Sequence, residues 1–278
     1  MIGTREDLIR RNAWRLGLIA VAALSIRGGR AEADSSRTRS SRIDRLLVTV
    51  LREGVYLFDL KGQVLWSHRC EAYDAAEAGR GQVLITDRSA GRVFTVNRGG
   101  EKVWEKAGLQ GPVNAEPLAN GNVLVVENDS GRVLEISPAG DTVREFAGHR
   151  TPFDARRRSN GNTVVADSAN NRIVEYDALG RKIRETGGLK FPNSLFLLPG
   201  GRTLFTTYSN GTIGELDAEG TLVWEKNIGG TLYSVEAEGD SIWVAEGAGG
   251  RVLRVSRDGV ILQEIKLGKV FVDVSFCR

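Results

Sequence analysis

Histidine, cysteine, proline and methionine are scarce in this sequence of 278 residues, with 2, 2, 6 and 1 copies respectively. Two histidines without a His-x-His or Glu-x-x-His spacing make a zinc site improbable. The sequence also lacks a serine nucleophile elbow, a phosphate-binding loop and a dinucleotide-binding fingerprint. These absences argue against the common zinc, serine-hydrolase and nucleotide-dependent enzymes.

A sustained excess of one charge is also missing. The formal net charge is +3, and the first 33 residues account for all of it with six arginines against three acids. Acidic and basic residues balance in the rest of the chain. Because nucleic-acid binding needs a clustered basic surface, no nucleic-acid partner is expected.

The apolar run near the N-terminus is short. Residues 16–26 form it, and eleven residues are too few for a bilayer span, which needs about 20. Arginines precede the run, and Ala31-Glu32-Ala33 has the small-x-small form of a signal-peptidase site. We expect a signal peptide over 1–33 and a Ser/Arg-rich tether over 34–42, with no transmembrane span. The protein is then periplasmic or secreted; otherwise the run is an amphipathic helix of a cytoplasmic protein.

The sequence is rich in glycine, with 34 copies. It also contains a repeat of about 40 residues. Each unit has three alternating apolar runs and a shorter fourth, separated by turn residues. Alternation with period two, rich in Val, Ile and Thr, predicts strands. Two sets of positions keep the period, one in the last strand and one at the opening of the second: Trp66, Trp104, Arg144, Arg184, Trp224 and Gln263, and Gly81, Gly121, Gly161, Gly201 and Gly239. The prediction is an all-β fold over 43–278, a six-bladed β-propeller of four-stranded antiparallel blades.

The two ends of the repeat region complement each other. The first copy starts near Ile43 with a second strand and has no innermost one, whereas a spare strand, Val270–Phe276, follows the last copy. Pairing the spare strand into the first blade would close the ring and remove its open edges. We therefore predict closure by the C-terminal strand.

Two repeat families are similar to parts of this chain. The segment 161–173, with Asp167-Ser168-Ala169-Asn170-Asn171-Arg172, resembles the NHL repeat. The outer strands 62–66, 100–104 and 220–224, each ending in Val-Leu-Trp, Lys-Val-Trp or Leu-Val-Trp, resemble quinoprotein (PQQ-like) repeats. Both resemblances imply a propeller, and neither implies one activity, because propellers host many.

Several repeated or paired residues are interpreted as structural. An acid ending the second strand and an arginine opening the third recur together and are lost together, which predicts ion pairs within hairpins. The outer tryptophans are expected to pack between blades rather than against a cofactor. Cys70 and Cys277 are expected at opposite ends of inner strands and therefore free. The four pairs, and the positions where both members are absent, are Asp87/Arg92, Glu127/Arg132, Asp167/Arg172 and Glu246/Arg251, and Thr207/Thr212 and Thr49/Gly54.

A set of six polar residues opens the innermost strands at the same period. We call it the polar ring: Asp74, Asn114, Asp154, Ser194, Ser234 and Asp273. Because these strands run the same way, the six side chains are expected at one mouth of the axial channel. Asp74, Asn114, Asp154 and Asp273 offer oxygen ligands suited to a divalent ion such as Ca²⁺. Six-bladed lactonases of the senescence-marker type are similar in architecture and hold such an ion there. The alternative is that these residues satisfy backbone amides at strand starts or contact channel water.

The next inward-facing positions do not repeat, and unrepeated residues are where individual function is expected. This second ring comprises Ala76, Glu116, Arg156, Phe196, Glu236 and Ser275. Arg156 is a candidate anion contact or a neutralised lining residue between Glu116 and Glu236. His68 and His149, both in connections on the polar-ring face, are candidate general bases, although loop histidines are more often solvated.

Three functions follow, of which the sequence favours the first. A monomeric, non-catalytic propeller would bind a protein, peptide, glycan or small molecule through the loops and polar channel mouth of one face. A divalent-metal-dependent hydrolase of the lactonase type would act through the polar ring. A quinone-dependent oxidoreductase would depend on the outer tryptophans alone.

Overall fold

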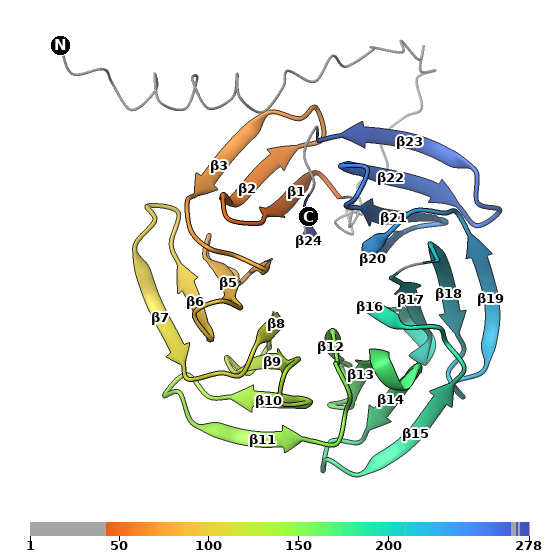
Figure 1. The fold of residues 1–278 in the computed structure, drawn as a ribbon, viewed down its shortest axis with the longest axis horizontal. Coiled ribbons are helices and arrows are strands. Elements are labelled where there is room, and N and C mark those ends of the chain that lie inside the picture. Colours follow the sequence, from red (N-terminus) through yellow and green to blue (C-terminus); the bar gives the residue numbers. More distant parts are fainter. Residues whose placement is uncertain (1–42, 209, 268–270, 272, 278) are drawn as a thin grey trace, which may run out of the picture.

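The computed structural model describes residues 43–208, 210–267, 271 and 273–277. Six four-stranded antiparallel sheets stand in a ring around a central axis (Figure 1), which confirms the predicted six-bladed β-propeller. The expected signal peptide and tether lie outside the described residues. In the described part, no helix is long and apolar enough to cross a membrane.

Each blade is a meander in which the innermost strand comes first, except in blade 1. Blade 1 contains β24 (Asp273–Cys277), β1 (Arg45–Val50), β2 (Gly54–Asp59) and β3 (Val64–His68). Blade 2 contains β4 (Asp74–Glu77), β5 (Val83–Asp87), β6 (Arg92–Val96) and β7 (Lys102–Ala107). Blade 3 contains β8 (Pro112–Pro117), β9 (Val123–Glu127), β10 (Arg132–Ile136) and β11 (Thr142–Phe146).

The other three blades follow the same order from the axis outward. Blade 4 contains β12 (Asp154–Arg157), β13 (Thr163–Asp167), β14 (Arg172–Tyr176) and β15 (Lys182–Gly187). Blade 5 contains β16 (Pro192–Leu197), β17 (Thr203–Thr207), β18 (Thr212–Leu216) and β19 (Leu222–Asn227). Blade 6 contains β20 (Leu232–Glu238), β21 (Ser241–Glu246), β22 (Arg251–Ser256) and β23 (Ile261–Lys266). Short 3₁₀ turns cover Ser168–Asn170 and Pro199–Gly201.

The C-terminal strand closes the ring as predicted. β24 pairs antiparallel with β1 from Arg45↔Cys277 to Thr49↔Asp273, and Figure 1 shows it at the axis beside β1. The strand begins at Asp273, later than the predicted Val270, and Val270 and Val272 lie outside the described residues. The chain thus supplies the innermost strand of its first blade from its far end.

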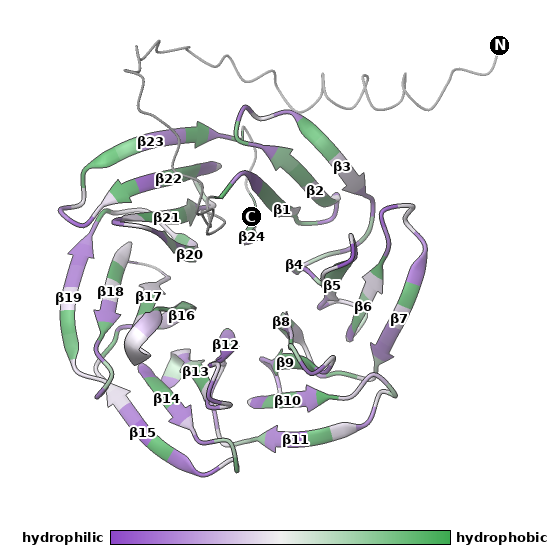
Figure 2. Cartoon of the chain, turned by 180° about the vertical axis from the view of Figure 1, so that it is seen from behind, coloured by the Kyte–Doolittle hydropathy of each residue, from purple (hydrophilic) through white to green (hydrophobic). Residues whose placement is uncertain are grey.

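The core is divided among the interfaces between neighbouring blades. Second strands such as β9 are buried at every residue, because both faces of each middle strand meet another blade. Outermost strands such as β7 and β15 are mostly exposed, and hydrophobic and hydrophilic segments alternate along them in Figure 2. This gradient of burial explains why the second strands have continuous apolar runs.

The glycines that mark the repeat are needed for the turns between first and second strands. Gly81, Gly121, Gly161, Gly201 and Gly239 all have φ between +56° and +89°. At Gly161, an added Cβ would also lie 3.1 Å from the Cβ of Ala178. Only glycine adopts this backbone conformation without strain. The turn therefore requires a glycine at the same position of each of these repeats.

The acid and arginine pairs are ion pairs within hairpins, as predicted. In all four hairpins the two residues are cross-strand partners, and the nitrogen–oxygen distances are 2.6–3.1 Å. In blade 5 the Thr212 amide donates to Thr207 Oγ1 instead, at 3.1 Å. In blade 1 the partner of Gly54 is Val50 rather than Thr49, because that hairpin is one residue shorter.

Replacing one acid of these pairs should destabilise the fold. Glu127 is fully buried and accepts hydrogen bonds from Arg132 at 2.6 Å, Ser130 at 2.6 Å and the Gln110 amide at 2.9 Å. Glu127→Ala leaves these donors unsatisfied, so we expect a loss of about 2–3 kcal/mol in the free energy of unfolding, measured in urea. Asp141→Ala, at an exposed turn of the same blade, is the control. Equal losses in the two variants would contradict a structural role for the pair.

The outer tryptophans pack between blades, as predicted. Trp66 Nε1 donates to the Arg98 carbonyl of blade 2, and Trp104 Nε1 donates to the Pro138 carbonyl of blade 3, each at 2.9 Å. The Arg257 guanidinium of blade 6 lies 5.4 Å from the ring centroid of Trp224. Each of these indoles thus joins its outermost strand to a turn of the next blade.

Both cysteines are free, also as predicted. Cys70 and Cys277 pack against the apolar cluster between blades 1 and 2. Burial raises the pKa of each thiol to about 12. Because thiolates are the reactive form, both thiols should react slowly at neutral pH.

Candidate functional site: an acidic central cavity

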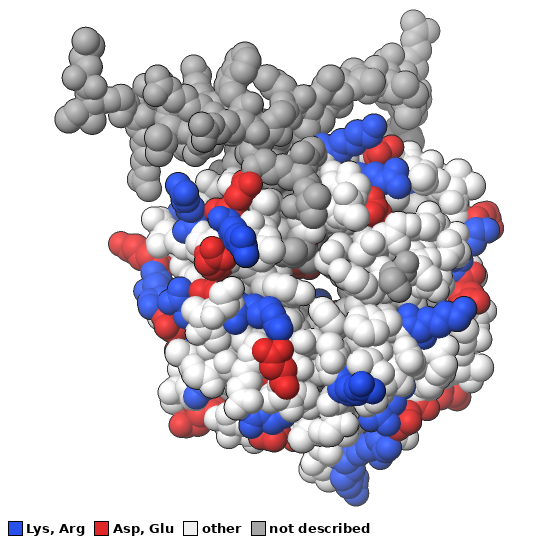
Figure 3. Space-filling view, in the orientation of Figure 1, with Lys and Arg blue, Asp and Glu red and all other residues white. Residues whose placement is uncertain are grey.

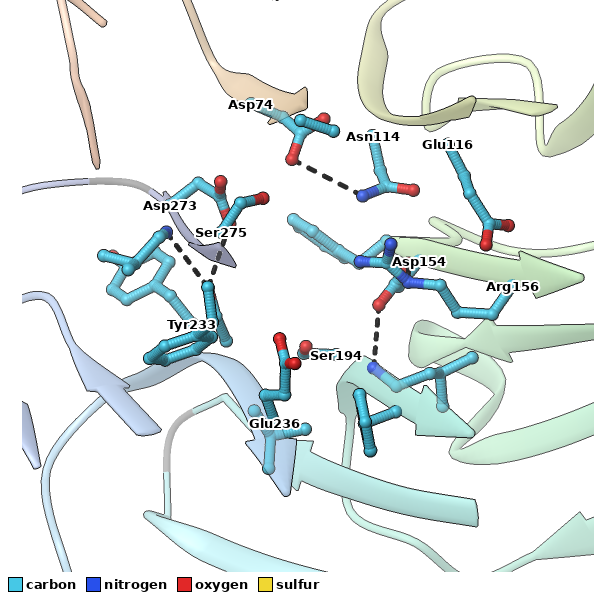
Figure 4. A pocket seen from close by; sticks show the side chains of 18 of the residues that line it. Asp74, Asn114, Glu116, Asp154, Arg156, Ser194, Tyr233, Glu236, Asp273 and Ser275 are labelled. Carbon is cyan, nitrogen blue, oxygen red and sulfur yellow. Dashed lines mark hydrogen bonds and ion pairs between the residues drawn. The ribbon is translucent and has the colours of Figure 1, made fainter. Parts of the chain in front are cut away.

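The innermost strands surround a central cavity of about 390 Å³. All six residues of the polar ring and all six of the second ring line it, and Figure 4 shows most of them converging on the axis. Positions one 40-residue period apart on the inner strands thus line the same cavity. Figure 3 views the molecule along the axis, and on this face acidic and basic side chains are interspersed around the central opening.

Half of the polar ring joins one blade to the next. The Asp74 carboxylate accepts from the Ala115 amide at 3.0 Å, and Asp154 accepts from the Leu195 amide at 2.7 Å. The Val274 amide donates to Ser234 Oγ at 3.1 Å. These contacts link blades 2 to 3, 4 to 5 and 6 to 1. The expectation that polar residues at strand starts satisfy backbone amides is thus met at these three positions.

The rest of the polar ring is less completely hydrogen-bonded. Asn114 Nδ2 lies 3.5 Å from Asp74 Oδ1, and Asp273 Oδ1 accepts from Ser234 Oγ at 2.9 Å. The single side-chain oxygen of Asn114, Oδ1, and the second carboxylate oxygen of Asp273, Oδ2, are buried and have no hydrogen-bond donor among the described residues. Ser194, also in this half, is buried at the cavity wall.

Arg156 is the central charged residue of the second ring. Its Nε lies 3.0 Å from Asp154 Oδ1, and Figure 4 shows its guanidinium beside Asp154, pointing toward the axis. Glu116 Oε2 accepts from the Arg157 amide at 2.8 Å. Burial opposes the charge on Arg156, but Asp154, Glu116, Asp74 and Asp273 together raise its pKa, so the guanidinium stays charged.

The cavity carboxyls titrate closer to neutrality than carboxyls in water. Burial raises the pKa of Asp74 to about 6 and that of Glu116 to about 7, although Arg156 opposes both shifts. Burial likewise raises the pKa of Asp154 and of Asp273, and the charge of Asp74 adds to the shift at Asp273. One guanidinium is therefore not enough to keep all of these groups ionised.

The predicted ligands of a divalent ion are not arranged as a metal site. Among the described residues, no group of three or more His, Cys, Asp or Glu side chains could hold a metal ion. Asp154 is engaged by Arg156 and the Leu195 amide, and Asp74 by the Ala115 amide. The Arg156 guanidinium already partly neutralises the carboxyls that a divalent ion would need. The residues Asp74, Asn114, Asp154 and Asp273 thus do not fit a Ca²⁺ ion in this arrangement.

A quinone cofactor does not fit the cavity either. Quinones of the pyrroloquinoline type carry carboxylates, which would meet a wall with more carboxyls than guanidinium groups. The tryptophans that suggested this cofactor lie on β3, β7 and β19 at the outer edge of the ring. Repulsion between like charges and the distance from the axis both oppose such binding.

The two candidate histidines lie away from the cavity wall formed by the described residues. His68 ends β3, and its ring stacks on Trp66 with centroids 6.0 Å apart. His149 is buried, with Nδ1 3.3 Å from Asp167 Oδ2 and Nε2 3.2 Å from the Tyr176 hydroxyl. These contacts account for His149 as a structural residue. Of the three catalytic candidates, only Arg156 reaches the cavity.

A group of aromatic side chains surrounds the cavity at the polar-ring end, and the sequence interpretation did not include it. We call it the aromatic mouth: Tyr73, Phe153, Tyr208 and Tyr233 line the cavity, and Phe191 packs against Phe153 and Tyr208. All five side chains are half-buried. Tyr73, Phe153 and Tyr233 directly precede polar-ring residues at spacings of 80, so the period could have revealed them. Phe191 and Tyr208 come from connections that the period does not describe.

The fold defines this protein as a six-bladed β-propeller. Residues 51–259 match the family model described as "Outer membrane protein assembly factor BamB". This match spans well over half of the chain. The protein therefore belongs to this PQQ-like family, as the outer-strand resemblance implied.

Solved structures with the same fold are distant in sequence. A protein of unknown function from Bacteroides caccae is 16% identical, with a TM-score of 0.71 over 84% of this chain and 98% of its own. Virginiamycin B lyase from Staphylococcus aureus is 15% identical, with a TM-score of 0.64 over 82% and 85%. A streptogramin B lyase is 15% identical, with a TM-score of 0.65 over 81% and 84%. No curated protein matches the sequence. These similarities show the fold.

Proposed function

We propose that this protein is an exported β-propeller that acts as a binding module through the loops and cavity mouth of one face. The proposal rests on one observation: repeated residues have structural roles, whereas unrepeated residues line the cavity. Repeated features, such as the hairpin ion pairs and turn glycines, build the blades. The unrepeated Glu116, Arg156 and Glu236 instead gather at the cavity wall.

The cavity has the size and composition of a ligand site. Its volume of about 390 Å³ falls within the range of about 300–1,000 Å³ typical of such sites. Aromatic rings at its mouth offer apolar contact area, and polar groups lie deeper. This arrangement combines contact area with orientation, which are the two requirements of specific binding.

The family supports a role in the cell envelope. Its description names an outer membrane protein assembly factor, which agrees with the signal peptide expected over residues 1–33. A partner or ligand of this protein is then a protein, peptide, glycan or small molecule of the envelope. Because proteins with the propeller fold have many different activities, the cavity and not the fold supports this function.

Site-specific photocrosslinking tests the proposal. Gln110 and Ala119 are exposed at opposite ends of the same inner strand, β8, and only Gln110 lies on the face of the aromatic mouth. A photoreactive amino acid at either position, illuminated in cells that produce the full chain, provides a matched pair. We expect a discrete adduct at 110 and not at 119, as detected by mass spectrometry. Adducts only at 119, or at neither position, would contradict binding through this mouth.

A further inference from the structure

The cavity has an excess of acidic groups. Among the described residues, four carboxyls in the cavity wall (Asp74, Glu116, Asp154 and Asp273) face the single guanidinium of Arg156. The remaining charged lining residues have partners elsewhere: Glu77 lies 2.8 Å from Arg98, and Arg157 lies 2.6 Å from Glu135. An added positive charge would therefore be attracted to the cavity and an anion repelled.

Two oxygen acceptors in the cavity wall lack donors. Asn114 is 7% exposed, and Figure 4 shows its carboxamide turned into the cavity. Its Oδ1 has no hydrogen-bond donor among the described residues, and neither does Asp273 Oδ2. Buried acceptors normally have partners, because an unsatisfied one costs about 1–3 kcal/mol. Both oxygens are thus positioned to accept N–H groups from a ligand.

The two acceptors come from the inner strands on either side of Asp74. Asp273 belongs to blade 1, Asn114 to blade 3, and Asp74 to blade 2 between them. Arg156 comes from blade 4 and is engaged with Asp154 of the same strand. Among the described lining residues, the inner strands of blades 1 to 3 therefore supply acceptors and carboxyls but no guanidinium or ammonium group. The nearby cations are Arg156, whose charge also acts on Asp74 and Asp273, and Arg88, which lies over the ring of Tyr73 at the mouth.

The aromatic mouth is suited to a cation with an apolar stem. The rings of Tyr208 and Phe153 stack with centroids 6.5 Å apart, and Tyr233 packs edge-on against Tyr208 at 5.4 Å. Ring faces attract cations electrostatically, while the rings also bury apolar groups. Such an entrance favours alkylammonium and guanidinium groups over inorganic ions, which have no apolar stem.

We propose that the cavity binds an organic cation, whose ammonium or guanidinium head donates to Asn114 Oδ1 and Asp273 Oδ2 while its apolar stem lies in the aromatic mouth. The proposal deepens the function proposed above and rests on it. Both a free amine and a lysine or arginine side chain of a peptide carry this chemistry. The volume of about 390 Å³ accommodates either.

Calorimetric titration of the full chain with matched probes tests the proposal. The cationic probes are n-butylammonium and Nα-acetyl-lysine N-methylamide, and their neutral counterparts are n-butanol and the norleucine analogue. We expect the cations to bind about tenfold or more tightly than the neutral probes. Similar affinity for both cations indicates free amines, whereas much tighter binding of the lysine derivative indicates a peptide. Equal affinity for neutral and cationic probes, or no binding of either cation at about 10 mM, overturns the proposal.

Variants test the two contact types separately. Asp273→Asn removes the acidic group, whose ionised form a bound cation favours, while the side-chain oxygen that accepts from Ser234 is retained. Tyr208→Leu removes one ring of the mouth. We expect about tenfold weaker binding for Asp273→Asn and about threefold for Tyr208→Leu. Glu219→Gln, at an exposed turn, is the matched control and should bind as the unmodified chain does. Unchanged affinity in both cavity variants overturns the proposal.

Thermal melts confirm that each variant is folded, and if one is not, the other still provides the test. The experiment also separates this proposal from the proposed function. A crosslinked adduct at position 110 without cation binding would mean that the mouth binds a ligand of other chemistry.

Discussion

Deleting residues 270–278 should prevent the propeller from folding cooperatively. β24 supplies the innermost strand of blade 1 and pairs with β1 over five residue pairs. Phe271 and Val274 are 0% and 2% exposed in the cluster between blades 6 and 1. Each large apolar side chain contributes about 1.5–3 kcal/mol when buried, and a domain has only about 5–15 kcal/mol in total. The deletion also exposes the edge of β1.

Circular dichroism during heating measures this effect. We expect either no cooperative transition or a Tm lower by more than about 10 °C, because about 1 kcal/mol shifts Tm by 2–4 °C at this size. Adding a synthetic peptide of residues 270–278 should restore part of the loss. Phe271→Ala should cost about 3–5 kcal/mol, whereas Leu179→Ala, at a side chain 76% exposed, should cost less than about 0.5 kcal/mol. A truncated chain that melts like the full one would contradict closure by β24.

The architecture was predictable because two periods coincide in the sequence. Alternation with period two defines strands, as in Val123–Val126, and the 40-residue period defines blades. Positive φ at turn glycines such as Gly161 ties the period to backbone geometry. The exact start of β24 was less predictable, because no following repeat constrains it. The repeat also indicated which inner-strand residues line the cavity, since all inner strands start on one face.

The contacts within the site were less predictable. The period placed Asp74 and Ala115 on adjacent strands, but it could not show that this carboxylate accepts from this amide. His149 was expected above the channel because its connection lies on that face. Its side chain is instead buried between strands, against Asp167. Phe191, with φ of 63°, reaches the mouth through an irregular connection. Loop paths depend on such local conformations, which no repeat encodes.

Arg156→Met should destabilise the protein strongly at pH 8 and much less at pH 5. At pH 8 the variant leaves the carboxylates of Asp154, Asp74 and Glu116 buried without their counter-ion. Breaking a buried ion pair in this way costs about 3–5 kcal/mol. Because burial raises the folded-state pKa of Asp74 to about 6 and of Glu116 to about 7, the folded protein binds more protons than the unfolded chain below these values. Stability should therefore increase as the pH falls through this window, more steeply in the variant.

The control for this prediction lies next to it on the same strand. Arg157 pairs with Glu135 at 2.6 Å. Burial opposes the charge of Glu135, but hydrogen bonds from Asn122 and Arg157 outweigh it and lower the pKa of this carboxyl. Asn120 and Asn122 still donate to Glu135 when Arg157 is replaced, so this carboxyl stays ionised over pH 5–8. Because Arg157 acts on Glu116 more weakly than Arg156 does, the cost of Arg157→Met should change much less with pH. Urea unfolding of the two variants at pH 5 and pH 8 provides the comparison. A cost for Arg156→Met that does not change with pH would show that the cavity carboxyls are not held near neutrality by burial, and the electrostatic account of the cavity would be wrong.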